Sequence, residues 1–282
     1  MSTVDGHDDR LAWAAGEISR WFPAAARDLP WRRVRTPWRS LVSEFMLQQT
    51  QVSRVAERFE PFLSIFPSPE AMAEAGEDAV LAKWSGMGYY RRARLLHAAA
   101  VSIVEHHGGV VPEDAATLET LPGVGRYTAG AIASIACGQS APIVDGNVDR
   151  VFARLTGDAS VPGAKGREGR RWQEAEVFVD AADLPDVANE GLMELGALVC
   201  QPKSAQCLIC PLSARCCALQ AGKVGEIPPP KPRPKKKLIE MQVGVAWRGK
   251  KLLLSRRPDT GLFAKTMFPP EIAAFSVSEE LR

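Results

Sequence analysis

Four cysteines in one short stretch constrain this chain more than any other feature. Cys200, Cys207, Cys210 and Cys216 lie in the segment VCQPKSAQCLICPLSARCCAL, with the spacing C-x6-C-x2-C-x5-C. Structural zinc sites usually pair two short cysteine knuckles across a longer spacer, whereas here a single C-x2-C knuckle has one cysteine on either side. We therefore favour an iron–sulfur cluster over zinc. Two disulfides are a third alternative, but no secretory signal supports them.

Composition and charge indicate how many domains the chain can form and which cellular partners it can have. The chain has 282 residues with 46% hydrophobic side chains, enough for one large or two compact domains. No apolar stretch is long enough to cross a membrane, and the polar start MSTVDGHDDR resembles neither a signal nor a transit peptide. We therefore expect a cytoplasmic protein without a membrane partner. The net charge is only +2, but basic residues gather at 31–35, 89–94 and 231–237, a weak indication of nucleic acid.

Helical periodicity dominates the first 220 residues. Thr36 followed by Pro37 is typical of a helix N-cap and first helical position, and an apolar face follows at helical spacing. No strand is predicted before residue 238. A proline- and lysine-rich stretch ending at residue 237 predicts an extended linker. Beyond it, LIEMQVGVAW and KLLLSRR around RGK predict a β-hairpin.

The motif LPGVGR at 121–126 predicts a tight turn between two helices. Its two glycines allow backbone amides to point outward, and the positive dipole end of the second helix faces the same way. This arrangement suits a phosphate, although a plain helix–helix turn has the same signature. The turn resembles the helix–hairpin–helix of DNA repair enzymes, and this resemblance implies Leu121, Gly123, Val124 and Gly125 as candidate DNA contacts.

Several motifs together resemble one known family. Combined with the cysteine spacing, they resemble the MutY-type adenine DNA glycosylases of the endonuclease III, or helix-hairpin-helix, superfamily. The resemblance runs nearly continuously from about residue 28 to 220, and LQQTQV is its most specific part. The segments that carry it are SEFMLQQTQV (43–52), GMGYYRRAR (86–94), LPGVGRYTAGAI (121–132) and IVDGNVDRV (143–151).

The resemblance implies a mainly α, two-lobed helix-hairpin-helix DNA glycosylase fold with an iron–sulfur cluster loop. A short β-hairpin fragment of a NUDIX-like C-terminal domain should follow, and whether that domain is truncated, frameshifted or divergent stays open. The domains we expect are a six-helix lobe (30–140), a second helical lobe (1–29 with 141–224) that carries the cluster loop (200–216), the linker (225–237) and a truncated NUDIX-like segment (238–282).

Two carboxyl groups are the candidate acid and anion of base excision. If Glu44 faces an apolar pocket, desolvation raises its pKa, and it can supply the proton that adenine needs in order to leave. Asp145 precedes a helix as a potential N-cap, and amide bonds would keep it ionised to stabilise an oxocarbenium-like sugar. Such a division between two carboxyl groups is typical of glycosidases. The plain alternatives are a solvated helix residue for Glu44 and a simple cap for Asp145.

Tyr127 stands where family members that also cut the DNA strand carry a lysine. A lysine amine can form a Schiff base with the sugar, and a tyrosine cannot. The sequence therefore predicts a monofunctional enzyme that removes a base and leaves the backbone intact. Tyr127 and Asn147 complete the predicted catalytic set.

The resemblance also places residues against the DNA. Gln49 and Tyr89 match residues that push into the duplex beside the base opposite adenine, where they replace stacking lost in base flipping. Gln48 is grouped with them, whereas Tyr90 should pack in the core. The predicted adenine pocket contains Leu29, Trp31, Arg32 and Glu190.

The function predicted from the sequence is acid-assisted hydrolysis of the N-glycosidic bond of adenine opposite 8-oxoguanine or guanine in duplex DNA. We expect a monomer with one [4Fe–4S] cluster, associated with the bacterial nucleoid. Two alternatives stay open. One is a thymine or uracil mismatch glycosylase of the same superfamily, and the other is a non-catalytic iron–sulfur protein that binds DNA or senses redox state.

Overall fold

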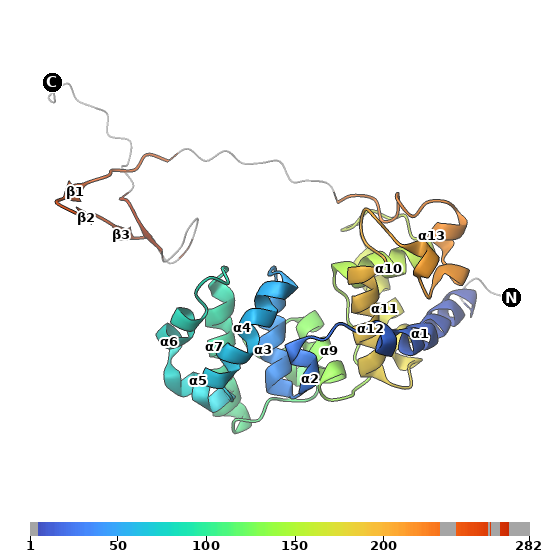
Figure 1. Ribbon diagram of the computed structural model, residues 1–282, viewed down its shortest axis with the longest axis horizontal. Coiled ribbons are helices and arrows are strands. Elements are labelled where there is room, and N and C mark those ends of the chain that lie inside the picture. The colour runs from blue at the N-terminus through green and yellow to red at the C-terminus, as the bar shows by residue number, and fades with distance from the viewer. Residues whose placement is uncertain (1–4, 232–240, 259, 261–265, 271–282) are drawn as a thin grey trace, which may run out of the picture. The chain divides into compact units, whose positions relative to one another are not determined.

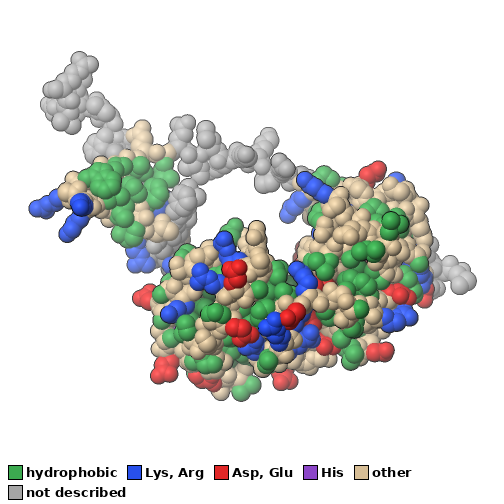
Figure 2. All heavy atoms as spheres, viewed as in Figure 1, with side chains coloured by type: hydrophobic (Ala, Val, Ile, Leu, Met, Phe, Trp, Pro, Cys, Tyr) green, Lys and Arg blue, Asp and Glu red, His purple; other side chains and the backbone are tan. Residues whose placement is uncertain are grey.

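The chain forms two compact units, one helical and one with short strands (Figure 1). The computed structural model describes residues 5–231, 241–258, 260 and 266–270. The helical unit is Met1–Lys231 and the second unit is Pro232–Arg282. Figure 2 shows basic and acidic side chains interspersed over the helical unit, in keeping with the small net charge. Within the described residues, no helix is both long and apolar enough to span a membrane.

The helical unit is built from short helices with clear local start signals. Thr36 is the N-cap of α3 as predicted, because its side chain accepts from Arg39 N at 3.2 Å. The helices are α1 (Asp5–Ala25), α2 (Pro30–Arg33), α3 (Pro37–Leu47), α4 (Val52–Ile65), α5 (Pro69–Ala75), α6 (Glu77–Lys83), α7 (Arg91–His107), α8 (Ala115–Leu118), α9 (Arg126–Ile135), α10 (Gly146–Thr156), α11 (Arg167–Asp180), α12 (Pro185–Leu198) and α13 (Cys217–Gln220), with the 3₁₀ turns η1 (Cys207–Ile209) and η2 (Ser213–Arg215).

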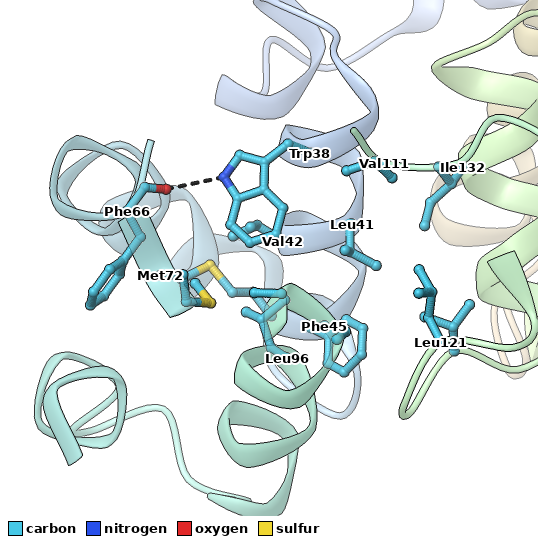
Figure 3. Packing of buried hydrophobic residues seen from close by; sticks show 14 of the residues in the cluster. Trp38, Leu41, Val42, Phe45, Phe66, Met72, Leu96, Val111, Leu121 and Ile132 are labelled. Atoms are coloured by element: carbon cyan, nitrogen blue, oxygen red, sulfur yellow. Dashed lines mark hydrogen bonds between the residues drawn. The ribbon is translucent and has the colours of Figure 1, made fainter. Parts of the chain in front are cut away.

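Two hydrophobic cores organise these helices. The first core gathers buried side chains of α3 to α9, and its centre is shown in Figure 3, where the Trp38 indole donates to Phe66 O at 3.1 Å. The second core gathers α1, α10, α11 and α12. Ile132 of α9 packs in the first core and Ala131 of α9 packs in the second. Because α9 belongs to both, it ties the two cores together directly after the LPGVGR turn.

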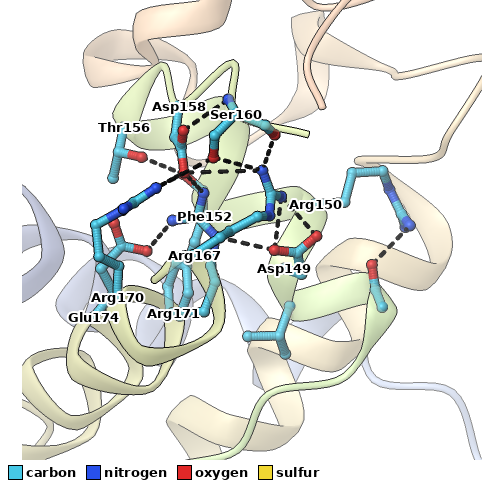
Figure 4. A network of polar contacts seen from close by, with 12 residues as sticks. Asp149, Arg150, Phe152, Thr156, Asp158, Ser160, Arg167, Arg170, Arg171 and Glu174 are labelled. Carbon is cyan, nitrogen blue, oxygen red and sulfur yellow. Dashed lines mark hydrogen bonds and ion pairs between the residues drawn. The ribbon is translucent and has the colours of Figure 1, made fainter. Parts of the chain in front are cut away.

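A polar network joins α10 to α11 beside the second core (Figure 4). Both carboxylate oxygens of Asp149 accept from Arg167 at 2.8 Å, and Oδ1 also accepts from Arg171 Nε at 3.0 Å. Arg171 is 1% exposed and also bonds Glu174. Buried charges are stable only when paired in this way. The network therefore holds the first turn of α10 against α11.

The second unit contains the predicted β-hairpin. Strand β1 (Trp247–Arg248) pairs antiparallel with β2 (Lys251–Leu252), and Gly249 at φ 61° makes the turn. A second antiparallel pair joins β3 (Ser255–Arg256) to β4 (Met267–Phe268). The second half of the predicted linker (232–237) and the start of the predicted hairpin (238–240) lie outside the described residues.

Candidate active site

One pocket of about 330 Å³ in the helical unit collects all the residues predicted for the catalytic set and the adenine pocket. Its walls come from the α1–α2 connection, α2, α3, α9, α12 and the start of α10. We call it the base pocket. The predicted residues that line it are Leu29, Trp31, Arg32, Glu44, Gln48, Tyr127, Asp145, Asn147 and Glu190.

Glu44 of α3 presents its carboxyl group to the base pocket. Burial raises the pKa of Glu44 to about 7. That value also includes a rise from the negative charge of Asp145, a lowering by a hydrogen bond with Tyr127, and a smaller rise from Glu190. Glu44 is therefore not the solvated helix residue of the plain alternative. A carboxyl group with this pKa can both hold and release a proton near neutral pH.

Asp145 caps α10 and is held by three donors. Its Oδ1 accepts from the backbone N–H of Asn147 at 2.9 Å and of Val148 at 2.7 Å. Its Oδ2 accepts from Asn147 Nδ2 at 3.0 Å. The predicted N-cap is therefore confirmed. The cap also fixes the carboxylate in the base pocket, across from Glu44.

Asn147 is oriented by an arginine that sequence reasoning missed. Arg150 donates to Asn147 Oδ1 at 2.9 Å and to the backbone oxygen of Cys200 at 2.7 Å. Arg154, one turn further along α10, donates to Gln201 O at 2.8 Å. Both arginines belong to the segment DRVFAR, whose helical spacing places them on one face. They connect the cap of α10 to the start of the cysteine loop.

An arginine–carboxylate cluster forms one wall of the base pocket. Arg27 donates to Glu194 through its backbone N–H at 3.0 Å and through its guanidinium at 2.8 and 2.7 Å. Arg32 bridges Glu194 at 3.2 Å and Glu190 at 3.1 Å, and Arg35 also bonds Glu190. Burial alone would raise the pKa of Glu194, but the hydrogen bonds from Arg27 and Arg32 lower it to about 2. The α1–α2 connection is thus fastened to α12.

Two loops beside the base pocket carry Gln49 and Tyr89, the predicted duplex contacts, and the first of these loops also contributes Gln48 to the pocket. Gln49 at φ 54° and Tyr89 at φ 47° both adopt the left-handed conformation that is uncommon for non-glycine residues. Together they line a second cavity of about 540 Å³, and Tyr89 is 62% exposed. We call residues 48–51 and 86–90 the paired loops. Tyr90 is 43% exposed, so the expectation that it packs in the core is wrong.

The paired loops are joined from beneath by Arg92. The guanidinium of Arg92 donates to Phe45 O and Met46 O at 2.9 Å and to Thr50 Oγ1 at 2.9 Å. It also lies 5.4 Å from the centre of the Tyr89 ring. The segment YYRRAR (89–94) predicts a cluster of charged residues on the surface. Arg92, however, is only 7% exposed. Arg92 is therefore not one of the basic residues of this segment that can contact DNA.

The LPGVGR turn offers fewer contacts than predicted. Leu121 and Val124 are buried in the first core, and their N–H groups bond Leu118 O and Leu121 O, each at 3.1 Å. Neither their side chains nor their amides are free for DNA, which corrects the prediction for these two residues. Gly123 has φ 79°, and a Cβ there would lie 2.8 Å from Leu95 Cβ. Within residues 5–231, the N–H groups of Gly123 and Gly125 bond no backbone oxygen, so they remain candidate contacts.

The four predicted ligand cysteines line one small apolar cavity in the loop after α12. All six cysteines of the chain are free thiols, contrary to the disulfide alternative. Burial raises the pKa of the Cys210 thiol to about 11, and Cys200, Cys216 and Cys207 add to the rise. These sulfurs are therefore within electrostatic reach of one another. In the described part of the chain, no three His, Cys, Asp or Glu side chains are arranged to hold a single metal ion.

Comparison with known proteins decides the family. A model for HhH-GPD superfamily base excision DNA repair proteins matches residues 42–176. The adenine DNA glycosylase of Mycolicibacterium smegmatis is 45% identical over 203 residues, and the matched region covers 70% of this chain and 67% of that protein. The chain belongs to the adenine DNA glycosylase branch of the HhH-GPD superfamily. The human adenine DNA glycosylase is 42% identical over 214 residues, which cover 73% of this chain and 39% of that protein.

A solved structure supports the same assignment at the level of the fold. A thermostable thymine-DNA glycosylase is 25% identical and has a TM-score of 0.67, covering 78% of this chain and all of that one. The predicted mainly α helix-hairpin-helix fold is therefore confirmed. The residues predicted for the catalytic group and the adenine pocket line one common pocket, and the sequence prediction missed three arginines and one methionine near the candidate site. They are Arg27, Arg92, Arg150 and Met193.

Proposed function

We propose that this chain is a monofunctional adenine DNA glycosylase that hydrolyses the N-glycosidic bond of adenine opposite 8-oxoguanine or guanine in duplex DNA. The observation that carries the proposal is the pair Glu44 and Asp145, which both line one pocket of about 330 Å³ and interact electrostatically. Burial raises the pKa of Glu44 to about 7, whereas three N–H groups hold Asp145.

The residues of the base pocket have distinct roles in this reaction. Glu44 donates a proton to a ring nitrogen of the flipped adenine, and the bond between base and sugar then breaks. The Asp145 carboxylate balances the positive charge that develops on the sugar. Water then adds to the sugar, the Glu44 carboxylate takes up the proton that the water loses, and the products are free adenine and an abasic site in an intact strand. Asn147 keeps Asp145 in place through its Nδ2 contact at 3.0 Å.

Tyr127 explains why the strand stays intact. Burial raises the pKa of Tyr127 well above its ordinary value, and Glu44 and Asp145 raise it further. Its hydroxyl group is therefore neutral, and it offers no amine that could form a Schiff base with the sugar. The base of the opposite strand would be read by Gln49 and Tyr89 in the paired loops, since both are solvent-facing and lie beside one cavity.

The four cysteines would hold a [4Fe–4S] cluster. The donor set consists of thiols alone, in one apolar cavity, which suits such a cluster. When bound, the cluster would supply four iron–thiolate bonds that fasten the loop 200–216 to the second core. Iron and sulfide analysis should give about four of each per chain. Stoichiometric zinc in a colourless anaerobic preparation would contradict the cluster.

A single-turnover assay on matched duplexes tests the proposal. Substrates with A:8-oxoguanine, A:guanine and T:guanine pairs are treated with or without alkali after reaction. We expect adenine release from the first two, with strand breaks only after alkali. Release of thymine, or equal breakage without alkali, would favour the thymine or strand-cutting alternatives. The pair Glu44→Gln and Glu57→Gln provides a matched control, because Glu57 is an exposed residue of α4.

A further inference from the structure

The hydroxyl group of Tyr127 has two competing acceptors. It donates to Met193 Sδ at 3.2 Å, across the base pocket from α9 to α12. It shares the pocket lining with Glu44, and hydrogen bonding by Tyr127 lowers the pKa of that acid, which favours its ionised form. Tyr127, Met193 and Glu44 all line the base pocket.

A phenol has one proton and can donate it to only one acceptor at a time. When the Tyr127 hydroxyl points at the thioether, its oxygen lone pairs are free to face Glu44. The protonated form of Glu44 can then donate to that oxygen or to a bound base. When the hydroxyl turns to Glu44, it stabilises the carboxylate and weakens the acid. The thioether of Met193 therefore competes with Glu44 for a single proton.

We propose that Met193 is a positioning residue whose thioether holds the Tyr127 hydroxyl proton away from Glu44, so that Glu44 keeps its own proton for the bound base. This role rests on the proposed function of Glu44 as the acid. A leucine of similar size and shape would fill the same space but accept no hydrogen bond. Packing and hydrogen bonding by Met193 can therefore be separated.

Other charged groups around Glu44 affect its ionisation, but none of them accepts the Tyr127 hydroxyl proton as Met193 does. Asp145, before α10, and Glu190, on α12, both oppose ionisation of Glu44 by their negative charge. Arg27 and Arg32 line the same pocket but bond Glu194 and Glu190. On the far side of α3, Arg92 bonds backbone oxygens. Of the groups that line the base pocket, the sulfur of Met193 is the acceptor that the Tyr127 hydroxyl bonds.

Met193→Leu tests the proposal through a pH profile. Without the sulfur, the hydroxyl group donates to Glu44 and favours its ionised form. The fall in single-turnover excision with rising pH should then begin at lower pH. A shift of one pKa unit corresponds to about a tenfold lower rate above pH 7.5, with little change near pH 5.5. Met72→Leu is the matched control, since Met72 is fully buried in the first core and far from the pocket residues in sequence.

Tyr127→Phe completes a double-mutant cycle. It removes the proton for which both acceptors compete, so Met193→Leu should cause no further shift in that background. The titration of Glu44 is also followed by NMR in ¹³C-glutamate-labelled protein without DNA, assigned with Glu44→Gln. A downward shift in Met193→Leu that vanishes with Tyr127→Phe supports the proposal.

An unchanged Glu44 titration in Met193→Leu, or a shift that persists without the Tyr127 hydroxyl, would overturn it and leave Met193 as packing alone. The NMR titration needs no turnover, so it also separates this inference from the proposed function. If the titration shifts as expected but the wild-type chain releases no adenine, the proposed reaction fails and the proton competition stands.

Discussion

The base pocket and the paired loops are built in opposite ways. In the base pocket, Glu190 and Glu194 are buried and bonded to arginines, and Asp145 is held by three N–H groups. In the paired loops, the functional candidates Gln49 and Tyr89 face solvent on left-handed backbone, and a buried Arg92 joins the loops from beneath. Proton transfer requires fixed charges in a region of low dielectric. Contact with a duplex requires exposed side chains on a rigid support.

This difference makes the two regions separable by mutation. Changes in the base pocket should alter the rate of adenine release on every duplex by a similar factor. Changes in the paired loops should alter the ratio of rates on A:8-oxoguanine and A:guanine. A variant that does both would show that the regions are coupled.

The largest effect is expected from Glu44→Gln. The amide keeps the shape of the side chain but has no acidic proton, so adenine release should fall at least about a hundredfold on both duplexes. Duplex binding, measured by fluorescence anisotropy, should persist. In the wild-type protein, release should decline as pH rises through about 7, because Glu44 acts in its protonated form and its pKa is about 7. Near-normal release by the variant would remove Glu44 from the reaction.

Asp145→Asn should lower adenine release on the order of a hundredfold. A neutral amide cannot balance the charge on the sugar, but its oxygen can still accept from the N–H groups of Asn147 and Val148. Tm from calorimetry should therefore change little. Retained activity with a large loss of Tm would mean that Asp145 is only the cap of α10.

Glu194→Gln tests the arginine-held wall of the base pocket. Its carboxylate has a pKa of about 2, below its ordinary value, so it stabilises the fold above about pH 4.5 and loses that effect as pH falls towards 2. The variant should lower the free energy of unfolding at pH 7 by about 3 kcal/mol. The difference from wild type, measured by urea unfolding, should shrink as pH falls. Glu176→Gln, at an exposed position on α11, serves as the control.

The smallest effect, and the sharpest test of the comparison, is expected from Arg92→Lys. An ammonium group cannot bond the backbone of α3 and Thr50 together as the guanidinium does. We expect the preference for 8-oxoguanine over guanine to fall about fivefold, the effect of losing roughly one hydrogen bond. Arg91→Lys, at the exposed neighbouring position, should leave the preference unchanged. A general loss of rate without a change in preference would couple Arg92 to the base pocket instead.

What could be predicted from the sequence depended on local contacts. The cap of α3 by Thr36 and the cap of α10 by Asp145 involve residues two or three positions apart, so the residue types alone indicate them. The hairpin around Gly249 is local in the same sense. The cysteine spacing and the motif around Glu44 were sufficient to identify the family, and the residues predicted for the site lie together in one pocket.

The contacts that tune this pocket were decided by the tertiary structure. Arg27 and Glu194 are 167 residues apart, and Tyr127 and Met193 are 66 apart, so no periodicity or motif connects them. Arg92 was expected on the surface but is buried, and Tyr90 was expected in the core but is exposed. A guanidinium can be buried when it donates to several backbone oxygens, as Arg92 does. The types of reacting groups were thus determined by the sequence alone. Their pKa values and orientations were not, because burial and hydrogen bonding depend on residues that only folding brings together.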